Sequence, residues 1–443
     1  MRLLFRHKWK GVERVATQTL HFKNRTINGV IEVPGDKSVS HRSIMFGAIA
    51  KGKTRVWNFL KGQDCLSTWD CFQKLNVSIS DQDQYLLIDG KGFEGLKEPA
   101  SILDVGNSGT TSRLLMGILA GRPFHSILIG DESIAKRPMS RVTAPLRLMG
   151  AKIDGRMNGE YTPISIRGGE LSSIHYEIPV ASAQVKSALL FAAMQANGVT
   201  ELTEKGETRD HTERMIQYFG GNLDKKGLTI RIDGSARLEG RDLVVPGDIS
   251  SAAFFIAAAI LAPNSELLIK NVGLNETRTG MITVLERMGA NLEIIPHSID
   301  SFEPYGDILV RSSKLQGTEI GGDLIPKLID EIPILALIAT QAEGRTVIKN
   351  AEELKVKETN RIDTVAHELQ KLGCKIIPTE DGLIIDGVSK LNGGIVDSHG
   401  DHRIGMMLAI ASLITEDSVH VQGTEAIDVS FPNFFQQLAS TMQ

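Results

Sequence analysis

Apolar and polar residues follow two periods along the chain, one typical of helices and one typical of strands. In the stretch ITVLERMGANLEII (282–295), apolar residues first recur at helical spacing, a Gly follows, and apolar and polar residues then alternate. The first spacing predicts an amphipathic helix, the Gly predicts its end, and the alternation predicts a half-buried strand. Helices and strands in this order predict an α/β fold.

This helix, turn and strand succession occurs five times. Its turn residue, Gly or Asn, recurs near positions 76, 150, 220, 289 and 373, at intervals of 69 to 84 residues. An interval of this length is typical of a repeated supersecondary unit. A sixth helix is expected in FPNFFQQLASTMQ (431–443), but no strand follows it. We expect the missing strand to come from residues 24–33, which would place both ends of the chain in one domain.

The length of 443 residues exceeds the roughly 250–300 that one hydrophobic core supports, so two domains are expected. The tetrapeptide VPGD occurs at 33–36 and at 245–248, each time between a strand-like and a helix-like stretch. We interpret the copies as crossings between a discontinuous domain, residues 1–33 plus 248–443, and a central domain, residues 34–247. Because Pro fixes φ and Gly permits a sharp turn, the pair would form a hinge. A strand-to-helix turn without hinge function is the alternative.

Composition narrows the setting in which the protein works. The net charge of −4 argues against general binding to nucleic acid or to an anionic membrane. The three cysteines are odd in number and lack C-x-x-C spacing, which is typical of a reducing compartment, so a cytoplasmic location is expected. The apolar run Ala252–Ala262 is too short to span a membrane and predicts a buried helix. Residues 1–15 fit neither a secretory signal nor a transit peptide and are expected to extend from the fold.

Polar residues gather where a strand-like stretch gives way to a helix-like one. Helix amino termini carry unpaired N–H groups and a partial positive charge, so a cleft lined by several of them would bind anions. The clusters begin at Asp36, Gly106, Ser182, Thr208, Lys357 and Asp401.

The cluster before residues 362–372 is the best defined. Apolar residues there follow helical spacing and end at Gly373, so Lys357 and Arg361, four positions apart, are expected to share one face of the first turn. Cations at this end oppose the helix dipole, which predicts an anion between them; an exposed surface pair is the alternative. Lys37 and Arg42 repeat the pattern after the first VPGD, whereas Ile249 replaces the Lys after the second.

Asp330 and Glu331 precede Pro333 at an expected helix start. Acidic side chains are common at helix starts, so a structural role is one interpretation. A carboxylate that faced the same cleft as Lys37 and Lys357 would be kept ionised and could act as a general base.

Eight motifs occur in order between residues 27 and 438. They are GDKSVSHRS (35–43), GNSGTT-R (106–113), KRPM (136–139), SAQVKSA (182–188), RDHTERM (209–215), LIDEIP (328–333), KVKETNRI (355–362) and GDHRIGM (400–406). By these motifs the chain resembles the 5-enolpyruvylshikimate-3-phosphate synthases, with SHRS and DHTERM similar to the second bacterial class. Residues 1 to about 20 lie outside the resemblance.

The resemblance implies a two-domain enolpyruvyl-transferase fold, in which each domain consists of three βαβαββ units, an inside-out α/β barrel, and a double crossover joins the two. It implies transfer of the enolpyruvyl group of phosphoenolpyruvate to the 5-hydroxyl of shikimate 3-phosphate, with release of phosphate, in the shikimate pathway to chorismate and aromatic amino acids. No metal or organic cofactor is expected to take part. The enzyme is expected to be a monomer without nucleic-acid or membrane partners.

The resemblance also implies roles for individual residues. Lys37, Asp330 and Glu358 would act in catalysis, with Asp330 accepting the hydroxyl proton and Glu358 moving a proton at the methylene carbon. The expected contacts to shikimate 3-phosphate are Lys37, Ser38, Arg42, Ser182, Ala183, Gln184, Arg209, Asp330 and Lys357. The expected contacts to phosphoenolpyruvate are Lys37, Asn107, Gly109, Arg137, Gln184, Arg361 and Arg403.

The chain departs from the family at two positions. Ser430 stands where one class has a Lys that contacts phosphoenolpyruvate, so this contact is not expected here. Ala183 stands where other members have Ser, which leaves only its backbone for contact.

Two other functions fit part of the pattern. The related transferase that acts on UDP-N-acetylglucosamine uses a Lys-Asn pair and a loop Cys, whereas here Ser38 follows Lys37 and the sequence has no Cys between 72 and 373. A non-catalytic binder of phosphorylated metabolites would not need Asp330 and Glu358.

Overall fold

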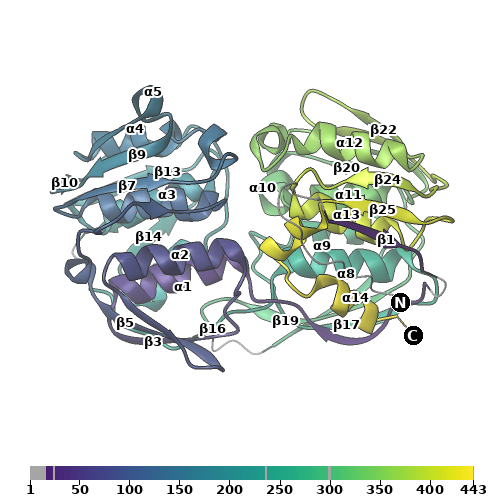
Figure 1. Cartoon of the computed structure of the whole chain (residues 1–443), viewed down its shortest axis with the longest axis horizontal. Coiled ribbons are helices and arrows are strands. Elements are labelled where there is room, and N and C mark those ends of the chain that lie inside the picture. The colour runs from purple at the N-terminus through teal and green to yellow at the C-terminus, as the bar shows by residue number, and fades with distance from the viewer. Residues whose placement is uncertain (1–15, 23–24, 235–236, 298–300, 443) are drawn as a thin grey trace, which may run out of the picture.

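Buried apolar residues form two separate clusters. In this computed structural model, which describes residues 16–22, 25–234, 237–297 and 301–442, one cluster runs from Val39 to Val245. The other combines Leu20–Val33 with Ile249–Leu438. We call the elements between residues 37 and 244 the central half and the remaining elements the outer half. Figure 1 shows the two halves side by side, and the first and last described segments of the chain both belong to the outer half. The predicted extension, residues 1–15, lies outside the described residues.

The central half contains three four-stranded sheets of one topology, in which two antiparallel strands extend a parallel pair. Their orders are β16 (Leu243–Val244), β3 (Lys51–Trp57), β5 (Tyr85–Lys91), β4 (Ser78–Asp81); β6 (Leu103–Asp104), β7 (His125–Ile129), β9 (Tyr161–Arg167), β8 (Lys152–Gly155); and β11 (His175–Glu177), β13 (Val199–Thr203), β15 (Thr229–Asp233), β14 (Leu223–Lys226). A parallel pair, β10 (Leu171–Ser172) and β12 (Ala196–Asn197), adds to them.

The outer half repeats this topology in two sheets, and its third sheet extends the parallel pair by one antiparallel strand. Its sheets are β18 (Asn291–Pro296), β19 (Tyr305–Arg311), β17 (Glu266–Gly273), β2 (Asn28–Glu32); β20 (Glu319–Ile320), β21 (Gly344–Ile348), β23 (Leu383–Gly387), β22 (Lys375–Pro378); and β1 (Thr17–Leu20), β25 (Val419–Gln422), β24 (Gly394–Asp397).

Each half buries three helices almost completely. They are α1 (Lys37–Ile49), α3 (Gly109–Ala120) and α6 (Ala183–Ala193) in the central half, and α8 (Ile249–Leu261), α11 (Ile332–Ala339) and α13 (His402–Ala411) in the outer half. The predicted buried helix at 252–262 is α8, which confirms that interpretation. Amphipathic helices are α2 (Gln63–Lys74), α4 (Ser140–Leu148), α7 (His211–Tyr218), α9 (Gly280–Arg287) and α12 (Arg361–Lys371). Shorter helices are α5 (Arg156–Gly159), α10 (Ile325–Leu328), α14 (Phe434–Ser440), η1 (Phe93–Gly95), η2 (Ile134–Lys136), η3 (Gly322–Leu324), η4 (Glu352–Val356) and η5 (Thr424–Val429).

The five predicted helix, turn and strand successions are α2–β4, α4–β8, α7–β14, α9–β18 and α12–β22. Every turn residue has a positive φ, between 71° and 108°, a conformation that favours Gly and Asn. This conformation explains why Asn76, Gly150, Gly220, Gly289 and Gly373 recur at these positions, and it confirms the predicted repeat. Within the described residues, no helix is both long enough and apolar enough to cross a membrane.

The predicted source of the last strand was wrong. The strand within 24–33 is β2, which pairs in parallel with β17 in another sheet of the outer half. The last sheet is instead extended by β1, Thr17–Leu20, which pairs antiparallel with β25. β1 is too short to produce a clear alternation, and it lies in the region outside the family resemblance.

The two VPGD turns explain how the chain passes between the halves. The strand before each turn belongs to the half that the chain leaves, since β2 pairs with β17 and β16 pairs with β3, and the helix after it belongs to the half that the chain enters. The turns also bond to each other, because the Asp36 N–H donates to Pro246 O and the Asp248 N–H to Pro34 O, both at 2.8 Å. A Cβ on Gly35 would lie 2.0 Å from Asn58 O, so this approach requires Gly.

Candidate active site

A cavity of about 640 Å³ lies between the halves and is lined by the starts of helices. Residues at the amino ends of α1, α3, α6, α12 and α13 reach it, together with Arg209 before α7 and Asp330 between α10 and α11. These positions correspond to the predicted polar clusters. Helix amino ends and cationic side chains therefore face the same space, which is suited to anions.

The first turn of α1 presents a lysine to the cavity. Asp36 caps the helix by accepting a hydrogen bond from the Val39 N–H at 2.9 Å, and Lys37 Nζ lies 3.0 Å from Asp64 Oδ2 at the start of α2. Burial acts to lower the pKa of Lys37, but the negative charges of Asp64 and Glu358 together outweigh it and raise this pKa. Lys37 is therefore held as a cation.

Arg42 is buried behind this turn and held on three sides. Its Nε donates to Thr212 Oγ1 at 2.7 Å, and its two terminal nitrogens donate to Ser187 Oγ at 2.8 Å and to Ser38 O at 3.0 Å. These bonds join α1, α6 and α7, so Arg42 fixes the relative positions of three helix starts.

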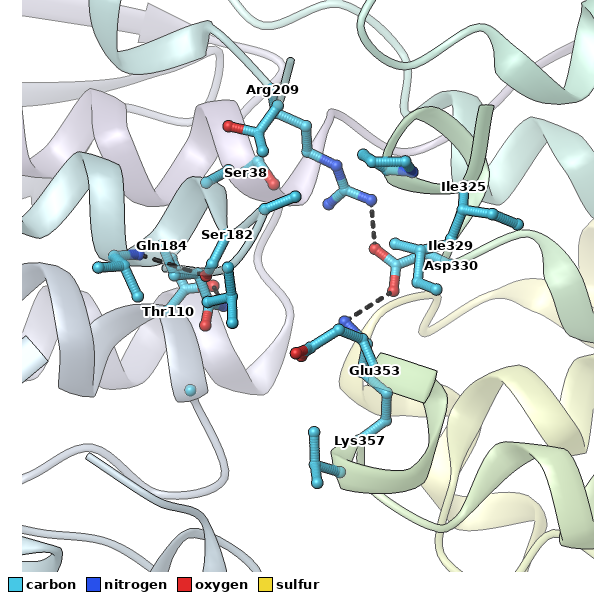
Figure 2. A pocket seen from close by; sticks show the side chains of 18 of the residues that line it. Ser38, Thr110, Ser182, Gln184, Arg209, Ile325, Ile329, Asp330, Glu353 and Lys357 are labelled. Atoms are coloured by element: carbon cyan, nitrogen blue, oxygen red, sulfur yellow. Dashed lines mark hydrogen bonds and ion pairs between the residues drawn. The ribbon is translucent and has the colours of Figure 1, made fainter. Parts of the chain in front are cut away.

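The starts of α3 and α6 are linked through one amide side chain. Ser182 caps α6, and Gln184 in its first turn donates to Thr110 Oγ1 at 3.2 Å and accepts from Arg113 at 2.7 Å. Figure 2 shows Ser182, Gln184 and Thr110 together on the central side of the pocket, opposite Asp330 and Lys357.

The Asp330 carboxylate lies among cations from both halves. Arg209 from the central half lies 2.5 Å away, and the cations of the outer half are Arg361 at 3.4 Å, Arg403 at 3.8 Å and Lys357 at 3.9 Å. Burial acts to raise the pKa of Asp330, but these positive charges outweigh it and hold the pKa well below its ordinary value. The carboxylate is therefore ionised at neutral pH, as a general base requires.

Glu358 precedes α12 and faces the cavity from the same half. Its oxygens lie 2.6 Å from Arg361 and 3.4 Å from Arg137 of the central half. Burial acts to raise the pKa of Glu358, but Arg361 and Arg137 hold it well below its ordinary value. Arg361 is itself buried, and Asp401, the cap of α13, accepts from its Nε at 2.8 Å. This pairing fixes α12 relative to α13.

Several ion pairs connect the halves across the cavity. They are Arg209–Asp330, Arg137–Glu358, Arg141–Glu353 at 2.7 Å and Lys327–Glu207 at 2.7 Å. Both sides of the cavity are therefore within direct reach of each other in this structure.

All but one of the predicted site residues line the cavity. The exception is Asn107, which is not among the lining residues and whose side chain donates to Asp131 at 2.6 Å. The predicted helical face shared by Lys357 and Arg361 was wrong, because α12 begins at Arg361 with Asn360 as its cap and Lys357 precedes the helix. The two cations nevertheless meet at Asp330.

Other ionisable residues in the cavity had received no predicted role. They include Asp64, Arg113, Arg141, Arg278 and His402. Burial, with the charges of Lys37 and Arg403, lowers the pKa of His402 to about 3, so its ring is neutral. Asp64 lies in the first turn of α2 and Arg278 between β17 and α9, so the rule that found the other clusters would have found them had it been applied to every strand-to-helix junction. Among the described residues, no group of three or more His, Cys, Asp or Glu side chains could hold a metal ion.

Known proteins resemble the chain along almost its whole length. The family model for EPSP synthase (3-phosphoshikimate 1-carboxyvinyltransferase) matches residues 22–438. The 3-phosphoshikimate 1-carboxyvinyltransferase of Bacillus cytotoxicus is 62% identical over 94% of this chain and 99% of its own, and that of Bacillus subtilis is 60% identical over 94% and 97%.

Solved structures agree with this match. EPSP synthase from Acinetobacter baumannii has a TM-score of 0.86 at 45% identity, over 96% of this chain and 98% of its own. The enolpyruvyl transferase NikO from Streptomyces tendae, at 16% identity and a TM-score of 0.77 over 96% of each chain, shares the fold. The predicted enolpyruvyl-transferase fold is confirmed. Since the family model and relatives this similar cover nearly all of it, the chain belongs to the EPSP synthase family, the 3-phosphoshikimate 1-carboxyvinyltransferases.

Proposed function

We propose that this enzyme transfers the enolpyruvyl group of phosphoenolpyruvate to the 5-hydroxyl of shikimate 3-phosphate, with release of phosphate, in the pathway to chorismate and the aromatic amino acids. One observation carries the proposal: two ionised carboxylates, Asp330 and Glu358, lie in one cavity with cations from both halves. The substrates bring two phosphates and two carboxylates, about five to six negative charges at neutral pH. A buried site lined by cations offsets their repulsion and the loss of their hydration.

The two substrates divide the cavity between them. Shikimate 3-phosphate binds on the side of α1, α6 and Arg209, and phosphoenolpyruvate binds where planar guanidinium groups can hold its carboxylate and phosphate by paired bonds. The contacts to shikimate 3-phosphate are Lys37, Ser38, Arg42, Ser182, the Ala183 backbone, Gln184, Arg209, Asp330 and Lys357. The contacts to phosphoenolpyruvate are Lys37, Gly109, Arg137, Gln184, Arg361 and Arg403.

Asp330 and Glu358 perform the proton transfers. Asp330 takes the proton of the 5-hydroxyl as its oxygen bonds to C2 of phosphoenolpyruvate. Glu358 takes up a proton from water once the bound anions offset the cations around it, and it delivers this proton to the methylene carbon, which gives a tetrahedral intermediate. Glu358 then takes a proton back from the new methyl group while the bond from C2 to the phosphate oxygen breaks. Phosphate leaves, and Lys37 stabilises the negative charge that develops on it.

Substrate binding changes the basicity of both carboxylates. Arg209 and Lys357 lie against Asp330 here, and the phosphate of shikimate 3-phosphate competes for them. Arg137 and Arg361, which hold Glu358 ionised, are contacts of phosphoenolpyruvate in the same way. As the substrate anions neutralise these positive charges, the pKa of each carboxyl group rises toward the range in which it exchanges protons readily.

We further propose that residues 34–247 and residues 1–33 plus 248–443 close over the substrates as two domains, with the hinge at 33–36 and 245–248. The two hydrophobic clusters and the reciprocal bonds between the VPGD turns support this division. Closure would exclude water and hold Arg137 and Arg209 against the outer carboxylates, where they lie in this structure. A monomer in the cytoplasm is the proposed working form, and three buried cysteines without disulfides suit it. Light scattering after gel filtration measures the molar mass and so tests the proposed monomeric state.

The direct test is release of inorganic phosphate from purified protein given phosphoenolpyruvate and shikimate 3-phosphate, without ATP. Release that requires both substrates is expected, and its absence contradicts the function. Asp330→Asn and Glu358→Gln should each abolish turnover while the protein still binds shikimate 3-phosphate by calorimetry. The control is Glu319→Gln, which alters an exposed partner of Lys349 that is not among the residues lining the cavity.

The same assay separates the alternatives. Turnover with UDP-N-acetylglucosamine in place of shikimate 3-phosphate would indicate the related transferase, and binding without turnover would indicate a metabolite binder. Relatives about 60% identical carry the 3-phosphoshikimate name, so neither alternative is favoured.

A further inference from the structure

Arg278 lies in the turn between β17 and α9, and its side chain is 4% exposed. One terminal nitrogen donates to Asp36 Oδ2 at 3.0 Å; the other donates to Asp248 Oδ1 at 3.3 Å and to Ser250 Oγ at 2.7 Å. Asp36 and Asp248 are the last residues of the two VPGD turns. A single guanidinium group of the outer half therefore joins both crossings.

On one side this contact leads to Lys37. Asp36 accepts from Arg278 with one carboxylate oxygen and caps α1 with the other, through the Val39 N–H. Lys37 is the next residue and the first of α1. A shift of the Asp36 carboxylate would therefore move the helix start that carries the lysine.

On the other side the contact leads to Asp330. Ser250, in the first turn of α8, accepts from Arg278 and donates its hydroxyl proton to Glu331 Oε1. Glu331 is 1% exposed and follows Asp330 directly. Arg278 is thus connected through one continuous, buried hydrogen-bonded network to the residue before Lys37 in the central half and to the residue after Asp330 in the outer half.

We propose that Arg278 is a positioning residue for the transfer reaction, which sets the distance between Lys37 and Asp330 by holding Asp36 and the Asp248–Ser250 segment in one frame. This inference rests on the proposed function. The planar fork of Arg can hold two carboxylates at fixed separation, which the single ammonium group of Lys cannot do. A misplacement of about 1 Å between reacting groups can lower a rate about 100-fold.

Direct contact with substrate is the competing role, because Arg278 lines the cavity and its Nε has no hydrogen-bond partner among the described residues. The two roles predict different kinetics. Loss of a substrate contact raises KM, whereas loss of position lowers kcat with KM little changed.

The test compares Arg278→Lys, Arg278→Gln and the double variant Arg278→Gln/Asp248→Asn with Arg345→Gln. Arg345 makes a two-bond pair with Asp386 on the exposed surface of the outer half, so its replacement controls for the loss of such a pair. The double variant is included because Arg278→Gln alone leaves Asp36 and Asp248 facing each other unpaired and could fail to fold. Steady-state phosphate release is measured against both substrates, with circular dichroism and thermal unfolding on the same samples.

We expect wild-type kinetics for Arg345→Gln, a fall in kcat of about 100-fold with KM within about threefold for folded Arg278→Gln, and an intermediate kcat for Arg278→Lys. The double variant should fold and remain slow, because removing one charge does not restore the frame. The proposal is overturned if the double variant recovers kcat to within about twofold of wild type, which would assign Arg278 to charge balance alone. It is also overturned if KM rises about tenfold or more at unchanged kcat. Phosphate release by the wild type and by Arg345→Gln tests the proposed function of the enzyme independently of the role of Arg278.

Discussion

Helices α1 and α8 begin after the same four residues, yet only α1 carries a charged side chain into the cavity. Each VPGD Asp caps its helix, Asp36 through the Val39 N–H and Asp248 through the Ser250 N–H. Lys37 follows the first copy and pairs with Asp64, whereas Ile249 follows the second and is buried in the outer core. The tetrapeptide thus determines where the chain crosses between the halves, and the residue after it determines whether the helix start takes part in chemistry.

The largest expected effect is at the residue after the turn. Lys37→Met keeps most of the side-chain length but removes the charge expected to face both substrates, so kcat/KM should fall about 1,000-fold. The matched change is Ile249→Met, a volume-conserving swap that should leave kcat/KM within about twofold. Phosphate release measures both. If kcat/KM of Lys37→Met stayed within about tenfold of wild type, the two VPGD copies would not differ in their contribution to catalysis.

The two Gly residues of the turns should differ next. A Cβ at position 35 would lie 2.0 Å from Asn58 O, and one at position 247 would lie 2.9 Å from the Val33 side chain. The first contact forces backbone to move and the second a methyl group, so Gly35→Ala should destabilise the protein by about 3 kcal/mol and Gly247→Ala by about 1 kcal/mol. Urea unfolding measures both. Equal losses of stability in the two variants would mean that the chain is packed equally closely at both crossings.

The two Asp residues should respond to pH in opposite ways. Burial and the charge of Asp36 raise the pKa of Asp248 to about 6. Burial also acts to raise the pKa of Asp36, but the charge of Arg278, together with smaller effects that include the hydrogen bond from the Val39 N–H, outweighs burial and lowers this pKa to about 2. The raised pKa means that Asp248 reduces stability increasingly as pH rises from about 4 to 6. The lowered pKa means that Asp36 adds stability above pH 4, which is lost as pH falls toward 2.

These signs predict the effect of removing each charge. At pH 7.5, Asp248→Asn should stabilise the protein and Asp36→Asn should destabilise it, each by about 2 kcal/mol. At pH 4 the gain from Asp248→Asn should vanish, because the wild-type carboxyl group is then protonated in the folded state. Denaturant unfolding at the two pH values checks this. If both substitutions changed the stability in the same direction at pH 7.5, the opposite pKa shifts of Asp36 and Asp248 would be contradicted.

The smallest expected difference is at the second helical position, which is Ser in both copies. Ser38 is an expected substrate contact, so Ser38→Ala should raise KM for shikimate 3-phosphate about fivefold and leave stability unchanged. Ser250 bonds Arg278 and Glu331 inside the protein, so Ser250→Ala should lower stability by about 1 kcal/mol. Steady-state kinetics and thermal unfolding on both variants show whether the roles are divided in this way.

Much of the fold could be predicted from the sequence because its repeat depends on local signals. The turn residues at 76, 150, 220, 289 and 373 all need a positive φ, which limits each position largely to Gly or Asn. β1 was missed because a four-residue strand, TQTL, carries too little alternation to be distinguished from a loop. Which strand a segment joins is a non-local property, and this is why β2 was assigned to the wrong sheet.

The candidate site was predictable where cations stand at helix starts, at which they oppose the helix dipole. Lys37, Arg361 and Arg403 belong to this class, and all three line the cavity. Arg278 also lies before a helix, but its role was not predictable, because its partners Asp36 and Asp248 are far from it in sequence and only the folded crossings bring them together. Lys357 was predicted in the cavity on a helical face that does not exist, since capping by Asn360 starts α12 after it.

The pairing of β2 with β17 sets the order in which the protein can fold during its synthesis. Residues of these strands lie about 238 positions apart, as the bond from the Glu266 N–H to Asn28 Oδ1 illustrates. The whole central half therefore leaves the ribosome before β2 meets its partner, and it can fold while the first strand of the outer half is still waiting. The outer half is complete only when the last helix has emerged. Its contacts of high sequence separation should make it the slower half to form.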